Sequence, residues 1–99
     1  MLIKCGVEIS RLKREIRRAL TIADKCYGLY GEELVITSTY EGNHSAGSLH
    51  YSNDAFDVRG VESSNNRLVS ELKIKLGNDY DVVLEASHIH VEYDPGKQK

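Results

Sequence analysis

Residues 88–93, His-Ile-His-Val-Glu-Tyr, alternate between polar and apolar side chains. Since successive side chains of a β-strand point to opposite faces, this alternation predicts a strand that directs Ile89 and Val91 into a core. His88 and His90 then share the other face of the same strand. A pair of imidazoles on one face can hold or activate a metal ion, and ordinary surface histidines give the same pattern.

The segments around this strand predict an α+β fold. Residues 33–40, 55–58 and 82–84 are rich in β-branched or apolar residues, which is typical of strands. Residues 7–25 instead carry apolar side chains at helical spacing, as does a second segment that follows a cap region at residues 63–65 and ends before residues 77–78. This order of helix, strand, strand, helix and strands predicts a small, mainly antiparallel sheet with two helices.

The composition is that of one globular domain over residues 1–99. The chain is 40% hydrophobic and 28% charged, with a net charge of -2. A chain of this length buries only a modest core, so a metal ion that ties segments together would add stability. The near-neutral charge predicts no general attraction to nucleic acid or acidic lipid, and we expect a monomer.

No stretch of the sequence has the length of a signal peptide or of a bilayer-spanning helix. We therefore expect a cytoplasmic location as synthesised and no association with a membrane. Cys5 and Cys26 are too few and too far apart in the sequence for a metal knuckle. In a reducing cytoplasm they are expected to be free thiols.

A second group of candidate ligands lies in residues 48–57, which read Ser-Leu-His-Tyr-Ser-Asn-Asp-Ala-Phe-Asp. His50 and Asp57 have an odd separation, so one regular strand would direct them to opposite faces. The turn-forming residues 52–54 lie between them and allow the two side chains to converge. A catalytic zinc ion keeps three imidazole or carboxylate ligands and one open position, so these two residues and one later histidine would suffice.

The same ten residues resemble the Ser-x-His-x-x-Gly-x-Ala-x-Asp signature of the zinc D-alanyl-D-alanine carboxypeptidase family. Relatives of that family include bacteriophage endolysins that cut peptidoglycan stem peptides and the amino-terminal signalling domain of hedgehog proteins. The Ser-Leu-His-Tyr start and the His-Ile-His pair are especially similar to hedgehog. The similarity covers residues 35–93, with Asn53 where the family has glycine. It implies a fold like that of the hedgehog domain and the D,D-peptidases.

The resemblance implies that His50, Asp57 and His90 bind Zn²⁺. Some carboxypeptidase relatives contain Glu-x-x-His, in which the histidine three residues after the glutamate binds the metal. That rule selects His88 as the third ligand. We favour His90, because the relatives with His-x-His match this sequence better over the whole motif.

Three catalytic roles also follow from the resemblance. Glu85 would be the general base, His88 a proton shuttle or a hydrogen-bond donor in the transition state, and His44 a stabiliser of the oxyanion. A solvated loop histidine is the other interpretation of His44. Glu85 differs in strand parity from the histidines, so it reaches the site only if residues 86–87 bulge or turn. Glu92 shares their parity and is expected at the edge of the pocket.

These features predict a zinc metallopeptidase that hydrolyses peptide bonds in peptidoglycan stem peptides. Arg59 is the basic residue nearest the motif, but the sequence does not place it as a clamp for a substrate carboxylate. This favours an endolysin-type endopeptidase over a carboxypeptidase. Such an enzyme would act on the cell wall after release or lysis. The alternatives are a catalytically inactive, zinc-stabilised binding module like hedgehog and a metal-free small domain.

Overall fold

The computed structural model describes residues 1–7, 9, 12–39, 55–61 and 65–95. These residues form two helices and a sheet of five strands. In chain order the elements are β1 (Leu2–Ile3), α1 (Arg14–Leu29), β2 (Val35–Ser38), β3 (Ala55–Arg59), α2 (Asn65–Leu76), β4 (Tyr80–Leu84) and β5 (His88–Tyr93). The sheet has the strand order β1-β2-β3-β5-β4, and every neighbouring pair except β1 and β2 is antiparallel. The predicted α+β class with a mainly antiparallel sheet is confirmed.

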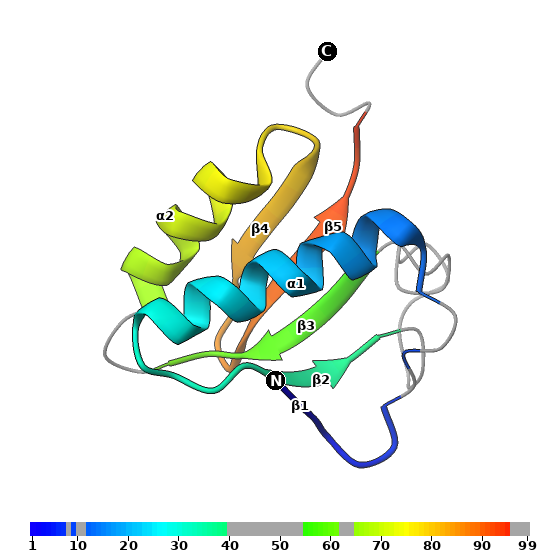
Figure 1. Cartoon of the computed structure of the whole chain (residues 1–99), viewed down its shortest axis with the longest axis vertical. Helices are drawn as coiled ribbons and strands as arrows, with labels where there is room; N and C mark the ends of the chain where they lie inside the picture. Colours follow the sequence, from blue (N-terminus) through cyan, green and yellow to red (C-terminus); the bar gives the residue numbers. More distant parts are fainter. Residues whose placement is uncertain (8, 10–11, 40–54, 62–64, 96–99) are drawn as a thin grey trace.

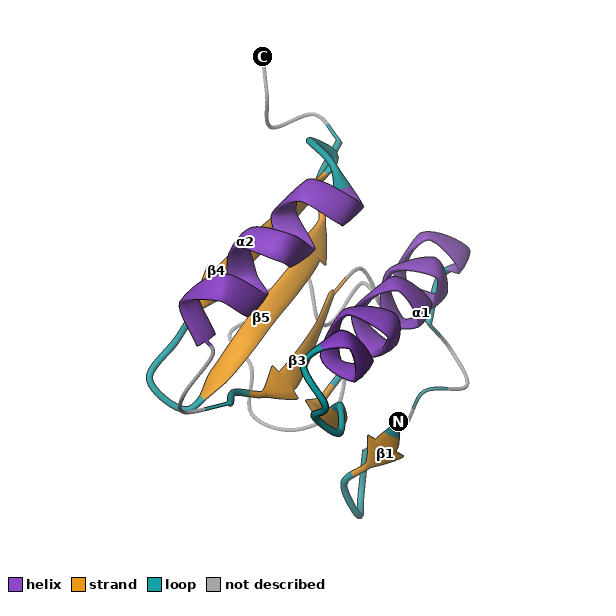
Figure 2. Ribbon diagram, turned by 60° about the vertical axis from the view of Figure 1, so that its left-hand side comes forward, coloured by secondary structure: helices purple, strands orange, loops and turns teal. Residues whose placement is uncertain are grey.

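Both helices lie on the same face of the sheet (Figures 1 and 2). Helix α1 crosses over β3 and β5, and α2 runs beside β4 (Figure 1). No helix of the described part of the chain covers the opposite face. Among the described elements, the helices therefore build the core on one face of the sheet only.

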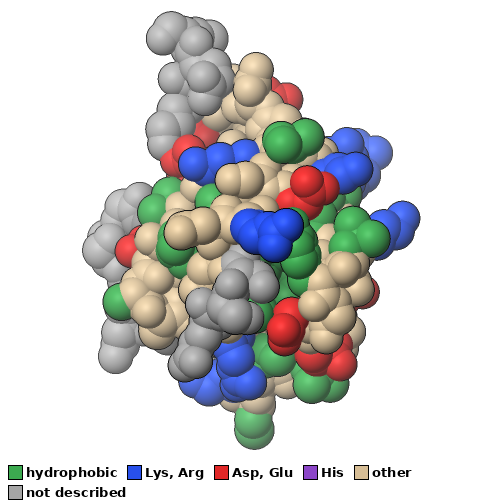
Figure 3. All heavy atoms as spheres, turned by 90° about the vertical axis from the view of Figure 1, so that its left-hand side faces the viewer, with side chains coloured by type: hydrophobic (Ala, Val, Ile, Leu, Met, Phe, Trp, Pro, Cys, Tyr) green, Lys and Arg blue, Asp and Glu red, His purple; other side chains and the backbone are tan. Residues whose placement is uncertain are grey.

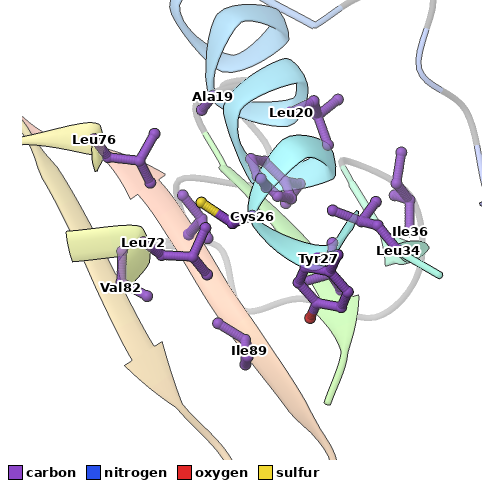
Figure 4. Close-up of a cluster of buried hydrophobic side chains, with 14 of the residues drawn as sticks. Ala19, Leu20, Cys26, Tyr27, Leu34, Ile36, Leu72, Leu76, Val82 and Ile89 are labelled. Carbon is purple, nitrogen blue, oxygen red and sulfur yellow. The ribbon is translucent and has the colours of Figure 1, made fainter. Parts of the chain in front are cut away.

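The core lies between the helices and the sheet (Figure 4). Phe56 and Val58 of β3, like Ile89 and Val91 of β5, are fully buried, as the alternation of side chains predicts. The helices contribute apolar side chains to the same core: Ile16, Ala19, Leu20, Ala23, Cys26 and Tyr27 from α1, and Leu68, Val69, Leu72 and Leu76 from α2. Neither cysteine forms a disulfide, as predicted.

Helix α1 begins and ends later than the spacing of apolar residues predicts. The prediction of residues 7–25 was wrong at the start, because Val7 and Ile9 pack against the core from outside the helix. Gly6 precedes them with a φ of 89°, a value that interrupts a helix. At the other end, Gly31 has a φ of 70°, and the N–H of Glu32 donates to the carbonyl of Tyr27 at 3.0 Å.

Strand β1 is a feature that the sequence pattern does not predict, because two residues are too few to show alternation. It pairs with β2 in parallel, with Leu2 opposite Val35 and Ile3 opposite Ile36. The N–H of Leu2 donates to the carbonyl of Leu34 at 2.7 Å, and that of Lys4 to the carbonyl of Ile36 at 2.9 Å. The terminal ammonium of Met1 lies 2.7 Å from the carboxylate of Glu33, and this hydrogen bond raises its pKa. The first residues are thus fixed to the edge of the sheet.

The surface carries charges of both signs. On the face that Figure 3 shows, Lys and Arg side chains and Asp and Glu side chains lie among hydrophobic ones. This mixture agrees with the net charge of -2. Neither described helix combines the length and the apolar character that crossing a bilayer requires.

Candidate active site

The register of β3 and β5 brings the candidate site together. The two strands pair without interruption from Ala55 opposite Glu92 to Arg59 opposite His88, and Asp57 lies directly opposite His90. Since Phe56 and its alternate neighbours face the helices, the residues between them face the other side of the sheet. The aspartate and both histidines therefore share the face that no described helix covers.

The imidazole of His90 lies between two carboxylates. Its Nδ1 is 2.8 Å from Oδ1 of Asp57, and its Nε2 is 2.7 Å from Oε1 of Glu92. Asp57 is only 8% exposed, which makes it one of the few charged side chains in the described interior. The hydrogen bond that His90 makes to Asp57 raises the pKa of His90, burial opposes this change, and the bond to Glu92 adds to it. The protonated ring can donate to both carboxylates at once.

His88 is the second imidazole on this face and is less enclosed than His90. Its Nε2 lies 3.6 Å from Oδ2 of Asp57, whereas His90 lies 2.8 Å from Oδ1. Its Nδ1 lies 3.2 Å from the hydroxyl of Ser87. Both histidines of the predicted pair therefore contact the same carboxylate, each through a different oxygen.

Glu85 lies at the turn between β4 and β5. Its N–H donates to the carbonyl of His88 at 2.9 Å, and the chain bends at Ala86 and Ser87. The turn that Glu85 would need in order to reach the site is thus present. The residue is exposed, and among the described residues no hydrogen bond or ion pair joins its carboxylate to Asp57, His88 or His90.

Two of the predicted site residues, His50 and His44, lie outside the described residues. The same holds for the turn predicted at residues 52–54. The structure therefore places four of the six predicted site residues, and it brings three of these four into contact: Asp57, His88 and His90. The proposed convergence of His50 on this group stays a prediction.

The described donor atoms include two of the ligand types that zinc binds. Among the described residues, no group of three or more His, Cys, Asp or Glu side chains is arranged to hold a metal ion. Asp57 and His90 nevertheless supply a carboxylate oxygen and an imidazole nitrogen, which are ligand types that zinc prefers. In the structure, Nδ1 of His90 and Oδ1 of Asp57 face each other at hydrogen-bond distance, 2.8 Å apart.

Glu92 is more closely involved in the site than the sequence predicted. Glu92 was expected only at the edge of the pocket, whereas its carboxylate binds directly to His90. The signal was present in the alternation of residues 88–93, which places all three polar side chains on one face. Neighbours two apart on a strand face lie about 7 Å apart at their Cα atoms, within reach of a glutamate and an imidazole.

Comparison with known proteins bears on the whole chain. A family model described as peptidase M15 matches residues 3–92, which is nearly the full length. No curated protein and no solved structure matched the sequence. Membership of this family indicates a metallopeptidase that acts on peptidoglycan, and peptidases of the family are generally zinc-dependent. The contact between Asp57 and the His-x-His strand agrees with such chemistry. The chain belongs to the peptidase M15 family.

Proposed function

We propose that this protein is a zinc-dependent metallopeptidase that hydrolyses peptide bonds in peptidoglycan stem peptides, with His50, Asp57 and His90 as the zinc ligands. One observation carries the proposal. A nearly buried carboxylate on β3 contacts both histidines of a His-x-His pair on β5, at 2.8 and 3.6 Å. A stable fold gains little from burying such a charged group away from water, so a functional role accounts for it better.

The contacts of the two histidines support His90 rather than His88 as the ligand. Histidines that bind metals commonly donate the ring N–H that faces away from the metal to a carboxylate, which fixes the orientation of the ring. Glu92 occupies this position at Nε2 of His90, so Nδ1 is directed at Asp57. The corresponding contact of His88 is the neutral hydroxyl of Ser87 at 3.2 Å. His88 is also more exposed, as suits a group that contacts substrate.

The chain's own residues would divide the work of hydrolysis. Bound zinc lowers the pKa of a coordinated water and polarises the scissile carbonyl. Glu85 accepts a proton from the attacking water and passes it to the leaving amine. His88 donates a hydrogen bond to the oxygen on which negative charge develops, and His44 supports it. Asp57 keeps both imidazoles of β5 oriented toward one point.

A second function, a zinc-stabilised binding module without turnover, is favoured by one observation. Glu85 is exposed and makes no ion pair with the described site residues. A general base must lie within hydrogen-bond reach of the proton that it removes, although such contacts are often completed only when substrate binds. If Glu85 does not approach the site on binding, the fold keeps its ligands and lacks its base.

Incubation of the zinc-loaded protein with purified muropeptides, followed by mass spectrometry for new termini, tests the proposal. Cleavage should be lost in Glu85→Gln and His88→Gln, while both variants retain zinc. Glu32→Gln is the matched control, because it removes the same charge at an exposed position of the loop after α1. Absence of cleavage of every stem peptide by the zinc-loaded protein would overturn the peptidase and leave the binding module.

A further inference from the structure

Arg59 places a positive charge beside the candidate site. It is the last residue of β3 and lies directly opposite His88 of β5. Residues that face each other across an antiparallel pair have Cβ atoms about 5 Å apart. Because Arg59 has the same parity as Asp57, its side chain leaves the sheet on the face that carries both histidines.

A small pocket adjoins this arginine. It has a volume of about 290 Å³ and is lined by Arg59, Gly60, Asn65, Ala86 and Ser87. Ser87 joins the pocket to the site, since its hydroxyl lies 3.2 Å from Nδ1 of His88. The pocket is therefore continuous with the group that we propose acts on substrate.

The backbone of the pocket is fixed from within the core. Tyr27, which is fully buried, donates its hydroxyl to the carbonyl of Arg59 at 2.6 Å. The N–H of Val61 donates to Oδ1 of Asn65 at 2.5 Å, so the chain after β3 is tied to the start of α2. Gly60 leaves room for this contact, because a Cβ there would lie 3.2 Å from Oδ1 of Asn65. Contacts within the fold thus hold the backbone at Arg59.

The charge of Arg59 has no partner within the described fold. Among the described residues, no ion pair involves Arg59. The carboxylate of Asp57, which lies on the same face two residues before Arg59, contacts the two histidines. A guanidinium presents donors in a planar fork that matches a carboxylate, and the hydroxyl of Ser87 offers a further donor.

We propose that Arg59 and its pocket bind a carboxylate of the peptide substrate next to the scissile bond. This inference rests on the proposed function and extends it to substrate recognition. The carboxylate has two sources in a stem peptide. If it is the terminal carboxylate, the enzyme removes the last residue as a carboxypeptidase. If it is the carboxylate of an internal residue, the enzyme is an endopeptidase. Arg59 is in either case a specificity-determining residue.

Equilibrium binding of synthetic stem peptides, measured by isothermal titration calorimetry, tests this proposal independently of hydrolysis. The probes are a peptide that ends in D-alanyl-D-alanine, its C-terminal amide, and a peptide in which the internal carboxylates are also amidated. Each is titrated into the full-length wild type, Arg59→Gln, Arg59→Lys and Arg18→Gln. Arg18 is an exposed residue of α1, so its variant loses the same charge on the helical side of the sheet.

Wild type and Arg18→Gln should bind the peptide with free carboxylates roughly 10- to 100-fold more tightly than the fully amidated one, as charge-assisted hydrogen bonds predict. Arg59→Gln should abolish this preference, and Arg59→Lys should restore part of it. If the C-terminal amide alone removes the preference, Arg59 binds the terminal carboxylate. If the preference is lost only when the internal carboxylates are also amidated, Arg59 binds an internal carboxylate. Equal affinity of wild type for all three peptides, or a preference unchanged in Arg59→Gln, would overturn the proposal. A protein that shows the preference without cleaving would refute only the proposed peptidase.

Discussion

Replacement of Tyr27 by phenylalanine removes a single hydroxyl that links the core to the site. The side chain of Tyr27 is fully buried, and its hydroxyl donates to the carbonyl of Arg59 at 2.6 Å. The ring of phenylalanine fills the same space, so packing against α1 and the sheet is conserved. The change therefore isolates one hydrogen bond at the end of β3.

The expected loss follows from the burial of the donor, since the side chain of Tyr27 is fully buried and the hydrogen bond is partly buried. Loss of a net hydrogen bond costs about 1 kcal/mol, and a carbonyl left without any replacement donor raises the cost to about 1–3 kcal/mol. Tyr80→Phe is the matched control, because its hydroxyl donates to the carbonyl of Glu15 at 2.8 Å from a partly exposed position. Water can replace that donor, so the control should lose less than about 1 kcal/mol.

The stability of the protein at alkaline pH is a second, independent test of the buried Tyr27 hydroxyl. Burial raises the pKa of Tyr27 above its usual value, so the phenol stays neutral in the folded chain when it ionises in the unfolded one. Tyr27 makes its full contribution to the free energy of unfolding below about pH 10. This contribution declines by about 1.4 kcal/mol for each pH unit above that value. The difference in unfolding free energy between wild type and Tyr27→Phe should therefore shrink above about pH 10.

Urea unfolding followed by circular dichroism, at neutral pH and above about pH 10, measures both effects. The buried hydrogen bond of Tyr27 would be refuted as a source of stability if Tyr27→Phe is no less stable than Tyr80→Phe at neutral pH and the stability of both variants changes equally above about pH 10. The same pair of proteins also reports on the site. Only Tyr27→Phe should weaken the preference for free carboxylates, because only Tyr27 contacts Arg59.

Two further predictions concern the scaffold, and both are read from unfolding midpoints. Leu72→Ala should lose about 2–5 kcal/mol, because the side chain is fully buried beneath α2, whereas Ile74→Ala, at 74% exposure, should change stability by less than about 0.5 kcal/mol. Equal losses in the two variants would contradict the orientation of α2, in which Leu72 faces the core and Ile74 faces solvent. Gly77→Ala should cost about 1 kcal/mol or more, since its φ of 87° strains any residue with a Cβ. Gly28→Ala, inside α1 with open space around its Cβ, should instead stabilise by about 0.5–1 kcal/mol, and a loss there would contradict the helix.

The faces of the strands could be predicted from the sequence alone. The alternation in residues 88–93 predicted that Ile89 and Val91 enter the core, and both are fully buried. The same argument placed His88 and His90 on the other face, where both contact Asp57. Side-chain parity is a local property of a strand, so it does not depend on knowing which strands are neighbours.

The pairing of those strands could not be predicted from the pattern. That Asp57 faces His90 and Arg59 faces His88 depends on the register between segments about thirty residues apart, which packing of the whole sheet decides. Strand β1 was not predicted because two residues are too few to show alternation, and the late start of α1 was not predicted because Val7 and Ile9 pack against the core without being helical. The resemblance to a known family supplied the connection between the two motifs, and the match to peptidase M15 confirms that resemblance. The assignment of each site residue stays a prediction.

Zinc content tests the central claim most directly. After zinc loading and removal of excess metal, elemental analysis of the wild type should find a single zinc ion per chain. His50→Ala, Asp57→Ala and His90→Ala should each lose most of it, because a site with three protein ligands tolerates the loss of none. His88→Ala should retain its zinc. Retention of zinc by all three ligand variants would contradict the account, and loss in His88→Ala but not in His90→Ala would move the third ligand to His88.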